Sequence, residues 1–314
     1  MSESRGTGKY ERVLARCKDI PPITAAVAHP CDDASLGAVI SAARAGVVQP
    51  ILVGPADRIR RVAKDLRLDI DAFPIEDAAH SQASAARAVE LVRQGRAEVL
   101  MKGSLHTDEL MSEVVRKDTG LRTSRRVSHA FVMDVPTYHK VLTITDAAVN
   151  IFPTLDDKRD IIQNVIEFMR ALGVERPKVA ILSAVETVTS KIPSTIDAAA
   201  LCKMADRGQI EGGLLDGPLA FDNAISAEAA RTKKIVSPVA GDPDVLVVPD
   251  LEAGNILVKN LNFLSRADAA GIVLGARVPI ILTSRADSER TRLASCAVAA
   301  LYAHARRLRA AVAA

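Results

Sequence analysis

The stretch EVLMKGSLHT at residues 98–107 combines the features that decide the fold class. Its first four residues form a short, mostly aliphatic run, which suits a strand buried on both faces of a sheet. A turn with a cation, a glycine and a serine ends this run. A helical pattern over 108–117 follows, and Thr107 is placed to cap that helix. A strand followed by a turn and a helix is the repeating unit of parallel α/β proteins.

The same unit recurs along the chain, so we predict an α/β fold in which helices cover a parallel sheet. The clearest helix is expected over 156–172, where apolar residues fall on one face and Thr154 with Asp157 forms a start signal. The other predicted strands are 23–27, 51–53, 141–144, 179–182, 245–248, 272–274 and 280–282, and the other predicted helices are 34–45, 56–66, 84–94, 252–265 and 287–309.

Length and composition indicate two domains with aliphatic cores. The chain has 314 residues, of which 48% are hydrophobic and 3% aromatic. At about 150 residues per domain, each of two domains is large enough to bury its own core. The stretch 132–153 is the least helical near the middle and is where we expect the chain to cross between domains. Small disulfide scaffolds and repeat fibres are excluded.

Charge and cysteine usage exclude further classes of protein. With 41 basic and 38 acidic side chains, the chain has no polybasic field for a nucleic-acid backbone, and its three Tyr and six Phe are too few for stacking platforms. The four cysteines form no CxxC pair, which indicates a reduced protein without a zinc knuckle. The polar N-terminus and the lack of a long apolar run predict a cytoplasmic protein without membrane contact.

Two strand ends carry residues suited to binding anions. In open α/β sheets, ligands bind beyond the carboxyl ends of the strands. The turn at 102–104 and the turn at 284–285 each combine a cation with a hydroxyl group and free backbone N–H groups at a helix start. Either turn alone could equally be a solvated cation with an ordinary helix cap. The two turns together favour a phosphate group as ligand.

Several well-known signatures are missing from the sequence. It contains no GxxxxGK[ST] loop, no GxGxxG after the first strand and no GxSxG elbow. The six histidines show no metal-ligand spacing, so we expect no metal site. Only His106 has a good positional argument, and on its residue type it is as suited to orienting the loop as to transferring protons.

Five ordered segments resemble the phosphate acetyltransferase and phosphate butyryltransferase family. They lie at 102–107, 128–133, 146–150, 248–256 and 279–288 and span most of the chain from residue 98 onward. The resemblance implies two three-layer α/β domains with a cleft between them, of the isocitrate/isopropylmalate dehydrogenase-like kind. The first domain would comprise 1–138 plus 277–314 and the second 139–276.

The resemblance also implies a reaction. A short acyl group, acetyl or butyryl, would pass reversibly between coenzyme A and inorganic phosphate, with both as substrates, no bound cofactor and a homodimer as the usual assembly. Arg285 resembles the family's phosphate-binding arginine, whose fork can hold two oxygens. Ser284 would hydrogen-bond the thioester carbonyl or the developing oxyanion. The substrate-binding positions implied are Lys102, Gly103, Ser104, Thr107, Arg122, Arg125, Ser128, Asp146 and Asn150.

One departure from the family pattern leaves the acid/base open. The acetyltransferase branch has an acidic residue seven positions after the serine, where this chain has Thr291. Asp287 and His106 are the two replacements that the sequence offers. The change keeps a non-catalytic acyl-CoA-sensing module as an alternative. A metal- and NAD-dependent decarboxylating dehydrogenase is a second alternative, although it would need clustered aspartates that the sequence lacks.

Overall fold

The computed structural model describes residues 8–282 and 287–313. The chain divides into two compact units, which we call the terminal unit (Tyr10–Arg125 with Ala270–Ala314) and the central unit (Arg126–Ala269 with Met1–Lys9). The borders of these units follow residues 125 and 269, whereas the sequence placed the domain borders after residues 138 and 276. The assignment of two enzyme domains stays a prediction.

The first border comes earlier because a hairpin holds the following residues in the central unit. Strand β5 (Ser128–Asp134) pairs antiparallel with β6 (Leu142–Thr145), with Ala130 opposite Thr145. The stretch in which we expected a crossing, 132–153, therefore lies within one unit.

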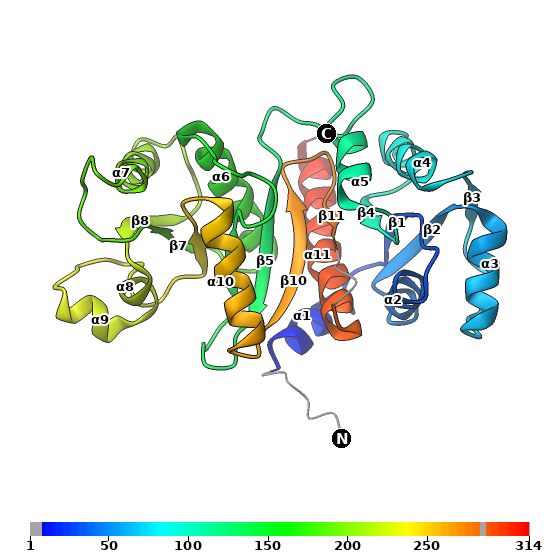
Figure 1. The fold of residues 1–314 in the computed structure, drawn as a ribbon, viewed down its shortest axis with the longest axis horizontal. Helices are drawn as coiled ribbons and strands as arrows, with labels where there is room; N and C mark the ends of the chain where they lie inside the picture. The colour runs from blue at the N-terminus through cyan, green and yellow to red at the C-terminus, as the bar shows by residue number, and fades with distance from the viewer. Residues whose placement is uncertain (1–7, 283–286, 314) are drawn as a thin grey trace. The chain divides into compact units, whose positions relative to one another are not determined.

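The terminal unit is built on a mainly parallel sheet in the order β3-β2-β1-β4-β11-β10 (Figure 1). Ala26 on β1 lies opposite Ile51 on β2 and Leu100 on β4, and all residues of β4 are buried. Only β10 runs antiparallel to its neighbour β11. The strands are β1 (Ile23–Ala28), β2 (Val48–Gly54), β3 (Ile75–Asp77), β4 (Val99–Lys102), β10 (Asp268–Leu274) and β11 (Ile280–Ile281), and the helices are α1 (Lys9–Cys17), α2 (Asp33–Arg44), α3 (Ala56–Asp65), α4 (Ser81–Arg93), α5 (Thr107–Val114) and α11 (Glu289–Ala313).

The central unit has strand order β5-β6-β9-β7-β8, and β6, β9, β7 and β8 are parallel. Its core gathers aliphatic side chains from these strands and from α10, among them Ile144, Leu246 and Val258. The remaining elements are β7 (Lys178–Leu182), β8 (Leu214–Leu219), β9 (Val245–Val247), α6 (Leu155–Ala171), α7 (Pro193–Asp206), α8 (Phe221–Ile225), α9 (Ala227–Thr232) and α10 (Leu251–Phe263).

Every predicted strand and helix overlaps an observed one, which confirms the α/β class. The start signal at Thr154 is also confirmed, because its hydroxyl accepts from the Asp157 N–H and the Asp157 carboxylate accepts from the Thr154 N–H at 3.0 Å. The elements that the sequence did not predict are α1, β3, β5, α7, β8, α8 and α9.

Strand β8 was missed because its glycine looks like a turn residue. Gly217 lies inside the strand, where a Cβ would come within 2.8 Å of the Ile181 side chain. The residue is therefore glycine because the strand packs closely against Ile181, and it does not form a turn.

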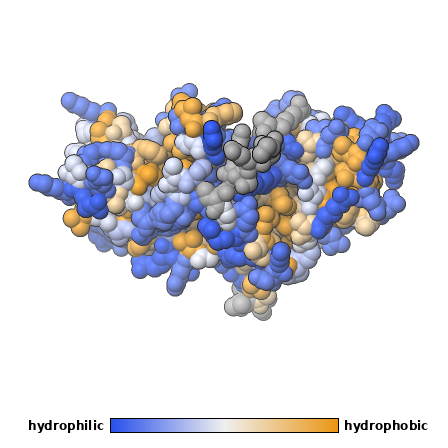
Figure 2. Space-filling view, turned by 90° about the horizontal axis from the view of Figure 1, so that it is seen from below, coloured by the Kyte–Doolittle hydropathy of each residue, from blue (hydrophilic) through white to orange (hydrophobic). Residues whose placement is uncertain are grey.

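The face drawn in Figure 2 carries mostly hydrophilic residues interrupted by hydrophobic patches. Among the described residues, no helix is long and apolar enough to span a bilayer.

Candidate active site

A pocket of about 410 Å³ opens in the terminal unit at the carboxyl ends of β1 and β4. The chain runs from β1 outward to β2 and β3, then returns to place β4 on the other side of β1. Such a reversal of strand order is where open α/β sheets bind their ligands. The side chains that line the pocket come from β-strand ends and helix starts, and they are His29, Asp32, Arg58, Ser81, Ser104, Leu105, His106 and Glu109.

The turn after β4 packs tightly against the end of β1. The Gly103 N–H donates to the Ala28 carbonyl at 2.8 Å, and the Ser104 N–H donates to the His29 carbonyl at 2.8 Å. The Ser104 hydroxyl donates to the same carbonyl at 2.9 Å. A Cβ on Gly103 would lie 2.4 Å from the Ala28 oxygen. Gly103 therefore holds the turn close to β1 and places Ser104 in the pocket wall.

Glu109 connects two helix starts at the pocket. Its carboxylate accepts from the Ser81 hydroxyl at 2.6 Å and from the His106 N–H at 2.8 Å. These two hydrogen bonds, that from Ser81 first, lower the pKa of the Glu109 carboxyl. His106 is the residue that precedes α5, and Thr107 is its first helical residue. The prediction that Thr107 caps this helix is wrong, because His106 holds the capping position. The side chains of His106 and Thr107 are both exposed.

His29 is the most constrained residue of the pocket. It is 6% exposed, and its φ of 57° lies in the left-handed region that residues other than glycine adopt rarely. Burial is the largest cause that lowers the pKa of its imidazole. Burial also raises the pKa of the neighbouring Cys31 to about 11, so this thiol stays protonated near neutral pH and is a poor nucleophile.

The other predicted residues of the terminal unit lie away from the pocket lining. Lys102 is the buried last residue of β4. Arg122 forms a backbone bridge to Ala276, and the Arg125 N–H donates to the Thr123 hydroxyl at 3.1 Å. Their roles toward substrate stay predictions.

The motif at the start of α11 is only partly visible. Ser284 and Arg285 lie outside the described residues. Asp287 is half-buried just before α11, and Ser288 caps this helix by accepting from the Thr291 N–H at 3.1 Å. Thr291 is buried, and its hydroxyl accepts a hydrogen bond from the Ser288 hydroxyl at 3.1 Å. The side chain that replaces the family's acidic residue therefore takes part in capping α11.

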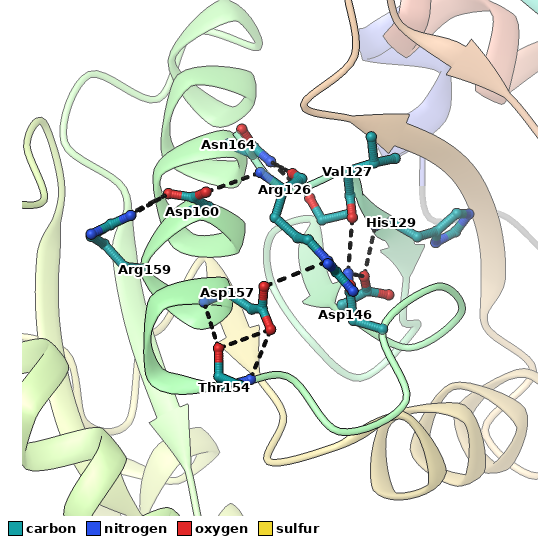
Figure 3. A network of polar contacts seen from close by, with 11 residues as sticks. Arg126, Val127, His129, Asp146, Thr154, Asp157, Arg159, Asp160 and Asn164 are labelled. Atoms are coloured by element: carbon teal, nitrogen blue, oxygen red, sulfur yellow. Dashed lines mark hydrogen bonds and ion pairs between the residues drawn. The ribbon is translucent and has the colours of Figure 1, made fainter. Parts of the chain in front are cut away.

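In the central unit, Asp146 organises the loop after β6 (Figure 3). Its carboxylate is 2% exposed and accepts four hydrogen bonds. The donors are the backbone N–H groups of His129 at 3.2 Å, Ala148 at 3.0 Å and Val149 at 3.0 Å, and the side-chain amide of Asn150.

The same network extends from Asn150 to helix α6. The Asn150 amide also donates to the Val127 carbonyl at 2.9 Å, and its oxygen accepts from the Arg126 Nε at 2.7 Å. Ser128, fully buried, accepts from the Asn164 amide at 3.0 Å. The structure therefore brings Ser128, Asp146 and Asn150 together as buried loop supports, and their contact with substrate stays a prediction.

His129 borders this network on β5 and points its ring away from Asp146 in Figure 3. Its ring centroid lies 4.3 Å from that of Phe131, and its buried Nδ1 has no hydrogen-bond partner within the described part of the chain. Burial lowers the pKa of the His129 imidazole to about 4, so the ring is neutral near pH 7.

Sequence reasoning missed His29, Asp32, Arg58, Ser81 and Glu109. The signal for His29 was present, because it directly follows the strand that ends at Ala28. The strand-end rule applies to that strand as it does to the others. Ser81 and Glu109 could not be found in this way, since they lie on helices and reach the pocket only through the packing of α4 against α5.

The fold is that of an α/β protein, and the pocket described above lies beyond the strand ends, where such folds bind their ligands. Residues 80–300 match the family model described as phosphate acetyl/butaryl transferase. The chain belongs to this family of phosphate acetyl- and butyryltransferases, and it is an acyltransferase that moves an acyl group reversibly between coenzyme A and phosphate.

Individual relatives agree with this assignment. A phosphate acetyltransferase of Rhizobium meliloti is 66% identical over 299 residues, which cover 95% of each chain. A phosphate butyryltransferase of Clostridium beijerinckii is 41% identical over 94% of this chain and 97% of its own. The crystal structure of a branched-chain phosphotransacylase from Enterococcus faecalis V583 matches with a TM-score of 0.79 at 30% identity, covering 90% of this chain and 99% of its own.

These matches decide between the functions left open above. They favour the acyltransferase over both the dehydrogenase and the non-catalytic acyl-CoA-sensing module. The isocitrate/isopropylmalate dehydrogenase-like detail of the fold stays a prediction. Within residues 8–282 and 287–313, no group of three His, Cys, Asp or Glu side chains is arranged to hold a metal ion.

Proposed function

We propose that this enzyme is a phosphate acetyltransferase whose preferred acyl donor is acetyl-CoA. The observation that carries the preference is the 66% identity to a phosphate acetyltransferase, against 41% to a phosphate butyryltransferase. In the forward direction, a phosphate oxygen attacks the thioester carbonyl, the carbon–sulfur bond breaks, and one proton passes from phosphate to the coenzyme A sulfur.

Both substrates are anions, so the site must hold them together against their repulsion. Arg285 is proposed to grip two phosphate oxygens, and Ser284 to hydrogen-bond the thioester carbonyl. The turn of Ser104 and His106 at the pocket is proposed to contact the second substrate. With the two substrates held in this way, most of the rate enhancement would come from their fixed positions and from the positive charge beside them, without a covalent intermediate or a bound metal ion.

The activity test compares acetyl-, propionyl- and butyryl-CoA at fixed phosphate and follows free thiol. We expect phosphate-dependent release, with kcat/KM for acetyl-CoA at least about tenfold above that for butyryl-CoA, since each methylene changes binding in a fitted pocket. The Arg285→Ala variant is expected to lose about 10²–10³-fold in kcat/KM for phosphate while keeping its melting temperature. Thiol release that does not need phosphate would contradict the reaction, and faster turnover of butyryl-CoA would contradict the acyl preference.

We also propose that the enzyme acts in the cytoplasm as a homodimer. All four cysteines are free, which supports a reducing compartment. Helix α10 exposes Ile256 at 68% and Phe263 at 77%, two turns apart on one face, and Leu264 beyond its end is 77% exposed. A second copy would cover this apolar face. Sedimentation equilibrium should give twice the chain mass of 33.4 kDa, and Ile256→Asp with Phe263→Asp should give the monomer. A wild-type monomer at working concentrations would rule the dimer out.

A further inference from the structure

The hydrogen bonds around His29 fix which of its ring nitrogens carries the proton. The Ser84 hydroxyl lies 2.8 Å from the His80 carbonyl and 3.1 Å from the His29 Nδ1. A carbonyl can only accept, so the single hydroxyl proton of Ser84 goes to His80. The Ser84 oxygen must then accept from the His29 Nδ1–H. In the neutral ring this leaves the lone pair on Nε2.

Because Nδ1 is bonded to Ser84, Nε2 is the ring nitrogen of His29 left for a ligand in the pocket. His29 lines the pocket although only 6% of its surface is exposed. Across residues 8–282 and 287–313, the side chain of His29 makes one hydrogen bond, through Nδ1. Nε2 makes none there, and it is not among the fully buried polar atoms that lack a partner. The ring of His29 is therefore held in place through Nδ1, and Nε2 is its free basic atom in the pocket wall.

Backbone hydrogen bonds of His29 also fix the position of its side chain. Its N–H donates to the Val53 carbonyl at 2.7 Å, and its carbonyl accepts from the N–H groups of Cys31 and Ser104, each at 2.8 Å. These contacts hold a left-handed conformation that is unfavourable for a residue other than glycine. Such strain persists at sites where the position of a side chain matters.

We propose that His29 is the proton carrier of the acyl transfer, with Nε2 accepting the proton from phosphate and delivering it to the coenzyme A sulfur. This assignment rests on the acyltransferase function. In the forward direction the carbon–oxygen bond forms, the carbon–sulfur bond breaks, and the proton moves from phosphate to Nε2 and on to the departing sulfur. In reverse, Nε2 accepts the proton of the coenzyme A thiol as sulfur attacks the acyl phosphate.

The charged groups around His29 suit a base that is free near neutral pH. Burial, Arg58 on α3 and His80 lower the pKa of the imidazole, whereas Glu109 on α5 and Asp32 raise it. The lowered pKa keeps the ring neutral at pH 7, so the base is ready without prior deprotonation. Protonation as the pH falls through this pKa removes the base, and the rate falls with it.

His29 meets the requirements for a base better than the two residues that the sequence offered. His106 is exposed, and it is paired with Glu109 in a capping box at the start of α5. Asp287 lies just before α11 and does not belong to the lining of the pocket. A base oriented by a third group, as His29 is by Ser84, is the arrangement that general-base catalysis uses.

The decisive variant is His29→Asn. Asparagine tolerates the left-handed backbone, and its side-chain amide can replace the Nδ1–H donor to Ser84, but it offers no base in place of Nε2. We expect kcat to fall about 10²–10⁴-fold in both directions, with KM values within about threefold and the melting temperature retained. The acidic limb of the wild-type pH–rate profile should disappear in the variant.

Chemical rescue separates a base from a structural role. His29→Gly also tolerates the backbone and leaves space for a free imidazole, and we expect added imidazole to restore part of kcat in proportion to its concentration. The matched control is His139→Asn, which removes an exposed histidine between β5 and β6, outside the pocket lining, and should leave kcat unchanged.

The proposal is overturned if His29→Asn keeps kcat within about threefold of wild type, or if it loses activity but retains the acidic limb and His29→Gly does not respond to imidazole. Failure of the acyltransferase assignment looks different, because wild-type protein would then release no thiol from any acyl-CoA in the presence of phosphate.

Discussion

The Asp146→Ala variant is expected to lose about 3–5 kcal/mol of unfolding free energy. Its carboxylate accepts four hydrogen bonds at 2% exposure, three of them from backbone N–H groups. Removing it leaves these donors without an acceptor where little water can reach them. Each unsatisfied buried donor costs about 1–3 kcal/mol, and part of the sum is recovered as the loop relaxes. We expect the loop after β6 to lose its fixed conformation.

Urea denaturation of the wild type and of two variants measures this effect. The matched control is Asp250→Ala, which removes a half-buried carboxylate that caps α10 through one hydrogen bond from the Ala253 N–H at 2.9 Å. A lost cap of this kind costs about 1 kcal/mol. Equal losses in the two variants would show that the Asp146 network is no stronger than a single helix cap.

The Gly103→Ala variant is expected to lose both stability and activity. The new Cβ would lie 2.4 Å from the Ala28 oxygen and 2.5 Å from the His29 oxygen. Both are backbone atoms of the β1 end, so no flexible side chain can move aside. We expect a loss of about 2–3 kcal/mol in unfolding free energy. The turn must also shift away from β1, which displaces Ser104 from the pocket wall and should lower kcat/KM about 10²-fold.

Gly37→Ala is the control for the same added methyl group. Gly37 lies inside α2, and its Cβ would meet no atom within 4 Å. Alanine favours a helix over glycine, so this variant should be unchanged or more stable by up to about 1 kcal/mol. If Gly103→Ala were as stable and active as Gly37→Ala, the turn after β4 would have room that the structure does not give it.

Local pattern was sufficient to predict most of the fold. Aliphatic runs located the buried strands, and helical periodicity located most of the helices. The capping pair of Thr154 and Asp157 was found as predicted. The missed elements depend on distant neighbours. Strand β8 needs Gly217 because of Ile181, and β5 is fixed by its pairing with β6. Sequence spacing carries no record of either contact.

The candidate site divides in the same way. The turn of Ser104 and His106 was predictable because it follows a strand directly. The resemblance to the family contributed Ser284 and Arg285. The position of His29 at the end of β1 was predictable in the same way, but its role depends on the proton of Ser84, a residue 55 positions away on α4. Glu109 is placed by its hydrogen bonds from Ser81 and His106. Roles that rest on which atom donates to which need three-dimensional neighbours.

Burial of the cysteines bears on how the reaction can be followed. Burial raises the pKa of the Cys17 and Cys31 thiols to about 11 and of the Cys202 and Cys296 thiols to about 12. Disulfide reagents react with thiolates, and a buried, protonated thiol reacts slowly. A colorimetric reagent added to native enzyme at pH 8 should therefore record the sulfur released from coenzyme A against a nearly silent protein background.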